Sequence, residues 1–137
     1  MRLIAAALLI ATGNEFSCSA PPTAVVMSSC ASTKVTVVVS TGPVPIYSWS
    51  PSCGVSFLMV QTDGGGSALW TVYGNSTTDN PIGSGVRYGL TPAEARTVAG
   101  PEPLRSGVTY RVVVSRLVCE SAGPCTLEPA GDAQFRF

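Results

Sequence analysis

The sequence predicts an all-β protein folded as a sandwich of two sheets, and three observations support this. Val, Thr, Ser, Gly and Pro dominate the 137 residues; β-branched residues favour strands, whereas Gly and Pro favour turns. Apolar residues recur at every second position in several short segments separated by turn-forming residues. The segment from Leu104 to Val114 is typical of a turn followed by a strand, with Tyr110 at the corner. The length suits one domain with its own core.

About seven short strands are expected along residues 34–137. Asp63–Ser67 contains three glycines and predicts a hairpin turn. Thr91–Arg96 is the only helix-like segment, and it is too short for more than one or two turns. The segment 55–62 is apolar on both faces, which is typical of a central strand. The strands are expected at 35–39, 46–50, 55–62, 68–73, 87–90, 108–119 and 133–137.

The first residues predict an export signal. One positive charge at Arg2 precedes a nine-residue apolar run, Leu3–Ala11, which is too short to span a bilayer and suits the core of a signal peptide. Cleavage after Gly13 or after Ala20 fits the small residues there. A third alternative is a lipoprotein leader in which Cys18 is acylated. We therefore expect a leader over 1–20, a linker over 21–33 and one domain over 34–137, exported to the periplasm, envelope or medium.

The cysteines predict disulfides. Without Cys18, four of the five cysteines can pair completely. Cys119 and Cys125 flank a segment that can turn back on itself, which predicts a bridge between them and leaves Cys30 to pair with Cys53. Zinc is the rival interpretation, but no pair has the Cys-x-x-Cys spacing and the chain has no histidine.

Composition also argues against several activities. Eight basic and eight acidic residues balance, so no net field attracts nucleic acid or anionic lipid. The absence of histidine removes the commonest general base and metal ligand. Gly83-Ser84-Gly85 is interpreted as a turn, because it lacks the spacing of a nucleophile elbow. The oxygens of Asn75–Asn80 lack the spacing of a calcium loop. We expect no catalytic residues, no cofactor and no metal site.

Three sequence blocks carry a resemblance to a known family, and the third of them in the chain, Gly131-Asp-Ala-Gln-Phe135, lies where the last strand is expected. Ile46-Tyr-Ser-Trp49-Ser-Pro51 resembles the second strand of a fibronectin type III domain, with a core tryptophan before a proline-containing turn. Leu104-x-x-Gly107-x-x-Tyr110 resembles the same family's penultimate strand with its tyrosine corner. The resemblance covers about residues 34–137. It implies an immunoglobulin-like sandwich, with Trp49, Leu104, Gly107 and Tyr110 as structural residues, of the kind found in small exported bacterial proteins without known activity.

A binding role is the functional expectation. We expect a non-enzymatic, exported module that contacts another protein or serves structurally, with a carbohydrate-binding module as the alternative. Tyr73, Arg87 and Tyr88 are the candidate contact residues, because Tyr and Arg are enriched at binding hot spots. Trp70 could join the tyrosines in an aromatic platform for sugar, although sharing a face with Val72 favours core packing. The sequence does not identify the partner or the oligomeric state.

Overall fold

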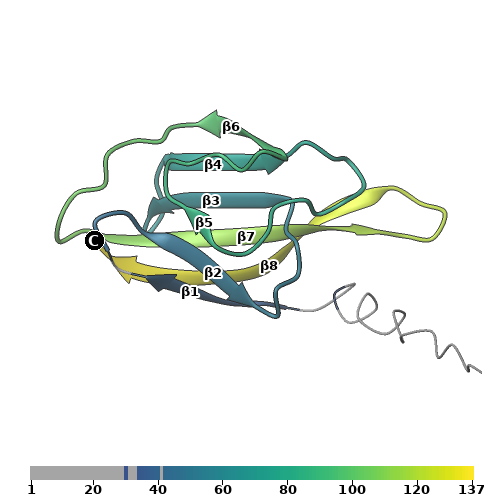
Figure 1. The fold of residues 1–137 in the computed structure, drawn as a ribbon, viewed down its shortest axis with the longest axis horizontal. Coiled ribbons are helices and arrows are strands. Elements are labelled where there is room, and N and C mark those ends of the chain that lie inside the picture. The colour runs from purple at the N-terminus through teal and green to yellow at the C-terminus, as the bar shows by residue number, and fades with distance from the viewer. Residues whose placement is uncertain (1–29, 31–33, 41) are drawn as a thin grey trace, which may run out of the picture.

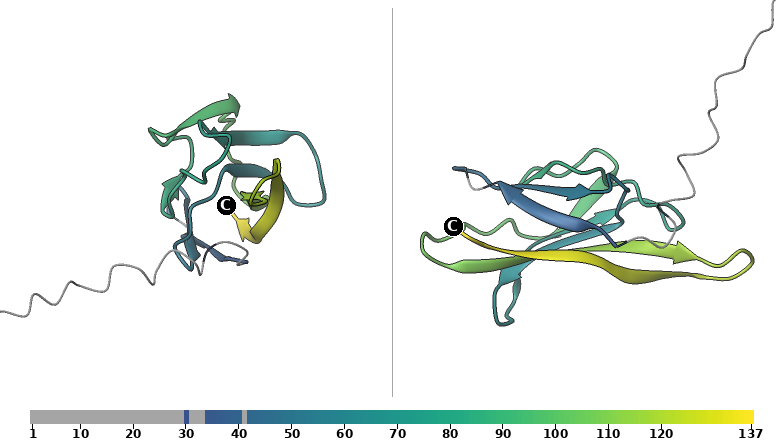
Figure 2. Two further views of the ribbon diagram at one scale, coloured as in Figure 1. Left: turned by 90° about the vertical axis from the view of Figure 1, so that its right-hand side faces the viewer. Right: turned by 90° about the horizontal axis from the view of Figure 1, so that it is seen from below.

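The computed structural model describes Cys30, residues 34–40 and residues 42–137, which form two antiparallel β-sheets packed face to face (Figures 1 and 2). The expected leader, linker and Cys18 lie outside the described residues. One sheet has the strand order β1-β2-β5, with β1 at Thr36–Ser40, β2 at Ile46–Ser50 and β5 at Val86–Arg87.

The second sheet has five strands in the order β6-β4-β3-β7-β8. Its central strand, β3, lies between β4 and β7, as the apolar character of both its faces predicts. The other strands are arranged outward from it (Figure 1). Their bounds are Ala95–Ala99 for β6, Ala68–Gly74 for β4, Phe57–Thr62 for β3, Thr109–Cys119 for β7 and Cys125–Arg136 for β8.

The expected helix at Thr91–Arg96 is wrong. The Ala95 amide donates to the Pro92 carbonyl 3.1 Å away in a turn, and Ala95 then begins strand β6. Ala95 is buried and pairs with Gly74 of β4. A single helical turn would leave its main-chain groups with few partners, whereas pairing with the edge of β4 satisfies them. Pairing with a neighbouring strand therefore overrides the local proline signal.

Two other expected strands differ in extent. The strand at 87–90 shortens to β5, because the Leu90 amide bonds back to the Arg87 carbonyl in a turn. The last strand begins at Cys125 rather than Ala133, because β8 pairs with β7 along almost its whole length. Val55 precedes β3 and forms an isolated bridge with Ile82.

The core lies between the two sheets. Trp49 of β2 is 3% exposed, and its Nε1 donates to the Cys53 carbonyl at 2.7 Å. Phe135 of β8 packs against Tyr47 and Tyr110, with ring centroids 5.6 Å apart in both pairs. The expected burial of Trp49 is therefore present in the structure, and its indole nitrogen has a partner. The fully buried large side chains of the five-stranded sheet are Leu58, Val60, Trp70, Val72, Tyr110, Val112 and Val114.

The corner before β7 has the geometry that its sequence predicts. Gly107 has a φ of +80°, a conformation that glycine adopts without a Cβ clash. Tyr110 is 1% exposed, and its hydroxyl oxygen accepts a hydrogen bond from the Arg105 amide at 2.7 Å. Leu104 packs against the core at the same corner. The buried hydroxyl thus holds the incoming turn against the sheet.

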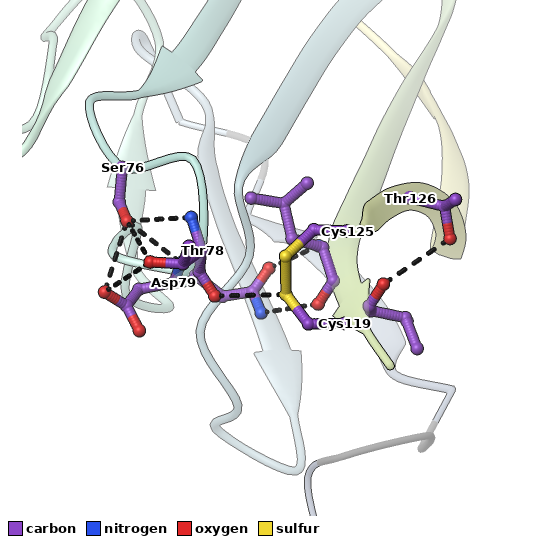
Figure 3. The surroundings of a disulfide bond; sticks show 9 residues. Ser76, Thr78, Asp79, Cys119, Cys125 and Thr126 are labelled. Atoms are coloured by element: carbon purple, nitrogen blue, oxygen red, sulfur yellow. Dashed lines mark hydrogen bonds between the residues drawn. A yellow bond between two sulfur atoms is a disulfide. The ribbon is translucent and has the colours of Figure 1, made fainter. Parts of the chain in front are cut away.

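Both expected disulfides are present. Cys30 and Cys53 have Cα atoms 5.6 Å apart, and this bridge ties the chain before β1 to the end of β2. Cys119 and Cys125 face each other across the β7–β8 pair, with Cα atoms 3.9 Å apart (Figure 3). The second bridge closes the tip of a long hairpin that extends beyond the rest of the sandwich (Figure 1). We call residues 117–127 of this hairpin the arm.

Within the described part of the chain, no helix is long and apolar enough to cross a membrane.

Candidate interaction surface

The outer face of the five-stranded sheet is apolar at its centre. Strand register places Tyr73 beside Phe57 and Met59 beside Val113, all on the face turned away from the core. All four side chains are partly exposed, and no described strand packs over them (Figure 2). We call these four residues the outer-face strip. A two-layer sandwich normally turns polar side chains outward, so this apolar strip is a candidate contact surface.

Small side chains alternate with the large ones on this face. Ser115 lies beside Phe57 in the same row, and Thr71 lies beside Met59. Both are buried, although they point outward, because the larger neighbours cover them. The Phe57 and Tyr73 rings pack edge to face, with centroids 4.8 Å apart. The outer face is therefore uneven: in the row of Phe57 the large Tyr73 lies on the β4 side and the small Ser115 on the β7 side, whereas in the row of Met59 the small Thr71 lies on the β4 side.

Charges of opposite sign flank the strip. On the β7–β8 side, the Arg111 guanidinium lies 3.4 Å from Asp63 Oδ1 and 3.3 Å from Asp132 Oδ2. Gln134 Nε2 donates to the same Asp63 oxygen at 2.8 Å. This group of two carboxylates and one guanidinium carries a net charge of −1. On the β6 side lies Arg96, which is exposed and forms no ion pair with any residue that the structure describes.

Two hollows lie at the borders of this face. One, of about 240 Å³, is lined by Tyr73, Arg96 and the arm residues Leu117 and Leu127 among others. The second, of about 610 Å³, lies beside Val113 and Asp132 where β1 approaches β8. The β1 chain comes close there: the Val35 amide donates to the Ala130 carbonyl at 3.0 Å. Both hollows are open, so they can receive side chains of a bound macromolecule.

One side chain forms with the arm the two main-chain hydrogen bonds that a neighbouring strand would otherwise form. Asn80 donates from Nδ2 to the Leu117 carbonyl at 3.0 Å and accepts from the Leu117 amide at 2.6 Å. Asn80 is itself fixed by a close approach, since a Cβ on Gly54 would lie 1.9 Å from the Asn80 carbonyl oxygen. The neighbouring Thr78 carbonyl lies 3.5 Å from Cys119 Sγ (Figure 3). The loop before residue 82 thus holds the β7 strand of the arm at Leu117.

The Asn75–Asn80 loop uses its own oxygens internally. Ser76 Oγ accepts from the Asp79 amide at 2.9 Å and donates to Asp79 Oδ2 at 3.2 Å (Figure 3). Thr78 Oγ1 also lies within hydrogen-bond distance of that carboxylate. Across the described residues, no three His, Cys, Asp or Glu side chains cluster in a way that could hold a metal ion. The loop oxygens serve to close the loop.

The structure does not bring the three predicted contact residues together. Tyr73 belongs to the outer-face strip, whereas Arg87 is exposed on β5 of the other sheet. Tyr88 is partly buried against the core, with its ring 5.2 Å from Trp70 and its hydroxyl donating to the Glu102 carbonyl at 2.6 Å. Trp70 is fully buried. The aromatic platform weighed from sequence therefore does not assemble, and only Tyr73 lies on the apolar face.

The Ser84 side chain forms hydrogen bonds to the main chain of β2. Its Oγ accepts from the Trp49 amide at 2.8 Å and donates to the Trp49 carbonyl at 3.2 Å. Ser84 therefore satisfies both main-chain groups of Trp49 where β5 does not extend to pair with β2. The glycine-flanked serine expected to form a turn serves the same purpose for β2 that Asn80 serves for β7.

Among the residues that the structure describes, three buried side-chain polar atoms lack a hydrogen-bond partner: Tyr47 Oη, Trp70 Nε1 and Arg116 Nη1. Arg116 makes one hydrogen bond, from Nε to the Gly54 carbonyl at 2.9 Å. Burial raises the pKa of Tyr47 above its usual value, and the nearby Tyr88 adds to this shift. Burial, with smaller contributions from Tyr110 and Glu102, raises the pKa of Tyr88 to about 12. Both tyrosines stay neutral at physiological pH and act as packing residues.

Sequence reasoning missed Phe57 and Met59 as surface residues. The relevant signal was present, since segment 55–62 is apolar on both faces. A central strand in a two-layer protein has only one covered face, so its second apolar face must point to solvent or to a partner.

No protein-family model matches the chain, and no curated protein sequence or solved structure is significantly similar to it.

Proposed function

We propose that the protein is a non-enzymatic, exported module that binds another protein through the outer face of its five-stranded sheet. One observation carries the proposal: an apolar strip of four residues lies on a sheet face that no described element covers. Aromatic residues and Met are enriched at protein interfaces, and hot spots lie in apolar centres rimmed by polar groups. The strip, with Arg96 on one flank and the Arg111 ion pairs on the other, has this composition.

Strand order supports an immunoglobulin-like fold of the fibronectin type III kind. Three strands, β1, β2 and β5, form one sheet. In the other sheet the strands β4, β3, β7 and β8 are neighbours in that spatial order. The buried Trp49 and the Tyr110 hydroxyl at the corner are further features of this class. Strand β6 is an addition at the β4 edge. Such folds host many activities, so the fold supports a scaffold role and leaves function to the surface.

Export is supported by the two disulfides. Disulfides persist in oxidising compartments and are rare in the cytosol. The leader-like sequence before residue 21 agrees with them. We place the protein in a bacterial periplasm, envelope or secretome.

The chemistry of the surface favours binding over catalysis. Asp63 and Asp132 both pair with Arg111, an arrangement that uses the carboxylates as ion-pair acceptors. Carbohydrate binding is less favoured than protein binding. Trp70 is buried, and the edge-to-face packing of Phe57 on Tyr73 does not offer the coplanar rings on which sugars stack.

Site-specific photo-crosslinking in the producing cell tests the proposal. A photoreactive phenylalanine analogue at Met59 should give a covalent adduct with a protein. The matched control is the same analogue at Val38, which is 60% exposed on the three-stranded sheet. Equal labelling from both positions, or no protein adduct from position 59, would contradict binding through this face. Turnover by the purified protein that one Asp or Glu substitution abolishes would contradict the non-enzymatic part.

A further inference from the structure

We infer that the protein partner of the outer face is a second copy of the same chain, packed face to face about a two-fold axis parallel to β3. This inference rests on the proposed function and names its partner. Two sheets pack about 10 Å apart, with their strands nearly aligned. An axis along β3 places β4 of one copy over β7 of the other, and β6 over β8. Every contact away from the axis then occurs twice, as symmetry requires of such an interface.

The side chains of the face are complementary under this rotation. Strand register puts Tyr73, Phe57 and Ser115 in one row, and Thr71, Met59 and Val113 in the next. Tyr73 therefore lies over the partner's Ser115, a large side chain over a small one. Phe57 and Met59 lie on the axis and meet their own copies. In the next row Thr71 lies over the partner's Val113, a side chain of similar size, so the large-over-small fit is carried by the Tyr73 row.

The charges match under the same rotation. Arg96 pairs with Tyr73 across the β4–β6 ladder, so it lies over the β8 strand of the partner. Asp132 of β8 lies one row away, beside Val113, a step of about 7 Å along the strand. An arginine side chain spans this distance. The Asp132 side chain is 53% exposed, and a carboxylate can accept hydrogen bonds from two guanidinium groups. Each Arg96 therefore gains the carboxylate that it lacks within its own chain.

The alternative axis is unfavourable. A two-fold axis perpendicular to the strands would place β6 over β6 and bring the two Arg96 side chains together. It would also bring the acidic group of Asp63, Arg111 and Asp132 over its own copy. Like charges facing each other across an interface oppose binding. Only the axis parallel to β3 joins opposite charges at both borders of the face.

Sedimentation of the purified, oxidised protein tests this inference. Over a series from about 1 µM to about 500 µM, the mass should rise toward that of two chains. Arg96→Asp and Asp132→Arg should each weaken self-association at least about tenfold, because each places like charges together. The double variant restores opposite charges and should regain most of the affinity. Arg87→Asp, the same reversal at an exposed position of the other sheet, should leave association unchanged. Met59→Lys should abolish it.

Each result decides between the two proposals. A wild-type protein that stays monomeric at every concentration overturns the second-copy inference. If that monomer still gives position-59 adducts with a different protein, the result supports the proposed function and contradicts only the second-copy inference. A dimer that survives Met59→Lys, or a double charge variant that regains nothing, also overturns the inference, because the face or the axis is then wrong. Absence of both self-association and position-59 adducts overturns both proposals.

Discussion

The two halves of the β7–β8 hairpin are stabilised in different ways. In the half inside the sandwich, Val112, Val114 and Phe135 are buried between the sheets. In the arm, Leu127 is 42% exposed, and the strands are held by the Cys119–Cys125 bridge and by Asn80. A shift in strand register between Val114 and Ser115 separates the halves. The comparison indicates that a hairpin leaving its core replaces apolar burial with a covalent link and side-chain to main-chain hydrogen bonds.

The largest expected effect is in the buried half. Phe135→Ala removes a ring that packs on Tyr47 and Tyr110 and should lower the free energy of unfolding by about 3–5 kcal/mol. Leu127→Ala in the arm is the matched truncation, and it should change stability by less than about 0.5 kcal/mol. Urea denaturation followed by fluorescence measures both. Similar losses from the two variants would mean that the arm is as well packed as the sandwich.

Removing the arm's bridge should have the next largest effect. Cys119 and Cys125 are six positions apart, and their bridge closes a short loop. Replacing both by Ser should lower the free energy of unfolding by about 2 kcal/mol, because the unfolded chain then loses this constraint. Amide hydrogen exchange should accelerate in residues 117–127 more than at Val112 and Val114. Uniform acceleration along the whole hairpin would contradict the separation into two halves.

Two buried tyrosines give a smaller, paired test. Tyr110→Phe leaves the Arg105 amide without its acceptor and should cost about 1–2 kcal/mol. Tyr47→Phe removes a buried hydroxyl that has no partner, so stability should stay equal or rise. Thermal or urea midpoints compare the variants directly. If Tyr47→Phe is the more damaging of the two, the Tyr47 hydroxyl has a partner that the described contacts do not include.

The smallest expected effect concerns Asn80. Asn80→Ala removes both hydrogen bonds to Leu117 and should cost about 1 kcal/mol, with faster exchange of the Leu117 amide. Asn80→Asp keeps the acceptor for that amide and loses only the donor, so its Leu117 amide should stay more protected than in Asn80→Ala. Indistinguishable exchange rates in the two variants would show that the arm does not depend on this contact.

The sequence predicted the inner strands well, because their signals are local. Strand β2 occupies the residues over which Tyr47 and Trp49 alternate with serines. Strand β6 was missed because its pairing with β4 is a contact between distant segments, and the nearby Pro92 carries a stronger local helix signal. The first half of β8 was missed for a similar reason: its exposed residues, including Glu128 and Pro129, show no apolar alternation. Its register with β7 holds it in place.

The candidate surface was predictable only in part. Tyr73 was identified because it falls on the face opposite Trp70 and Val72. Periodicity reports which faces of a strand are apolar, but it does not report which faces another layer covers. Phe57 and Met59 were therefore indistinguishable from core residues until the two-layer arrangement was known. Arg96 could not be assigned to the same face, because the strand that carries it was expected to be a helix.

The paired hydrogen bonds of Ser84 and Asn80 have a consequence for solubility. An exposed strand with unpaired amide and carbonyl groups is a template on which another chain can add, and growth of this kind leads to aggregates. Ser84 occupies the donor and acceptor of Trp49, and Asn80 occupies those of Leu117. Each side chain therefore stops further strand addition at the point where the protein's own sheet ends. At these two positions the main chain is therefore closed to a further strand.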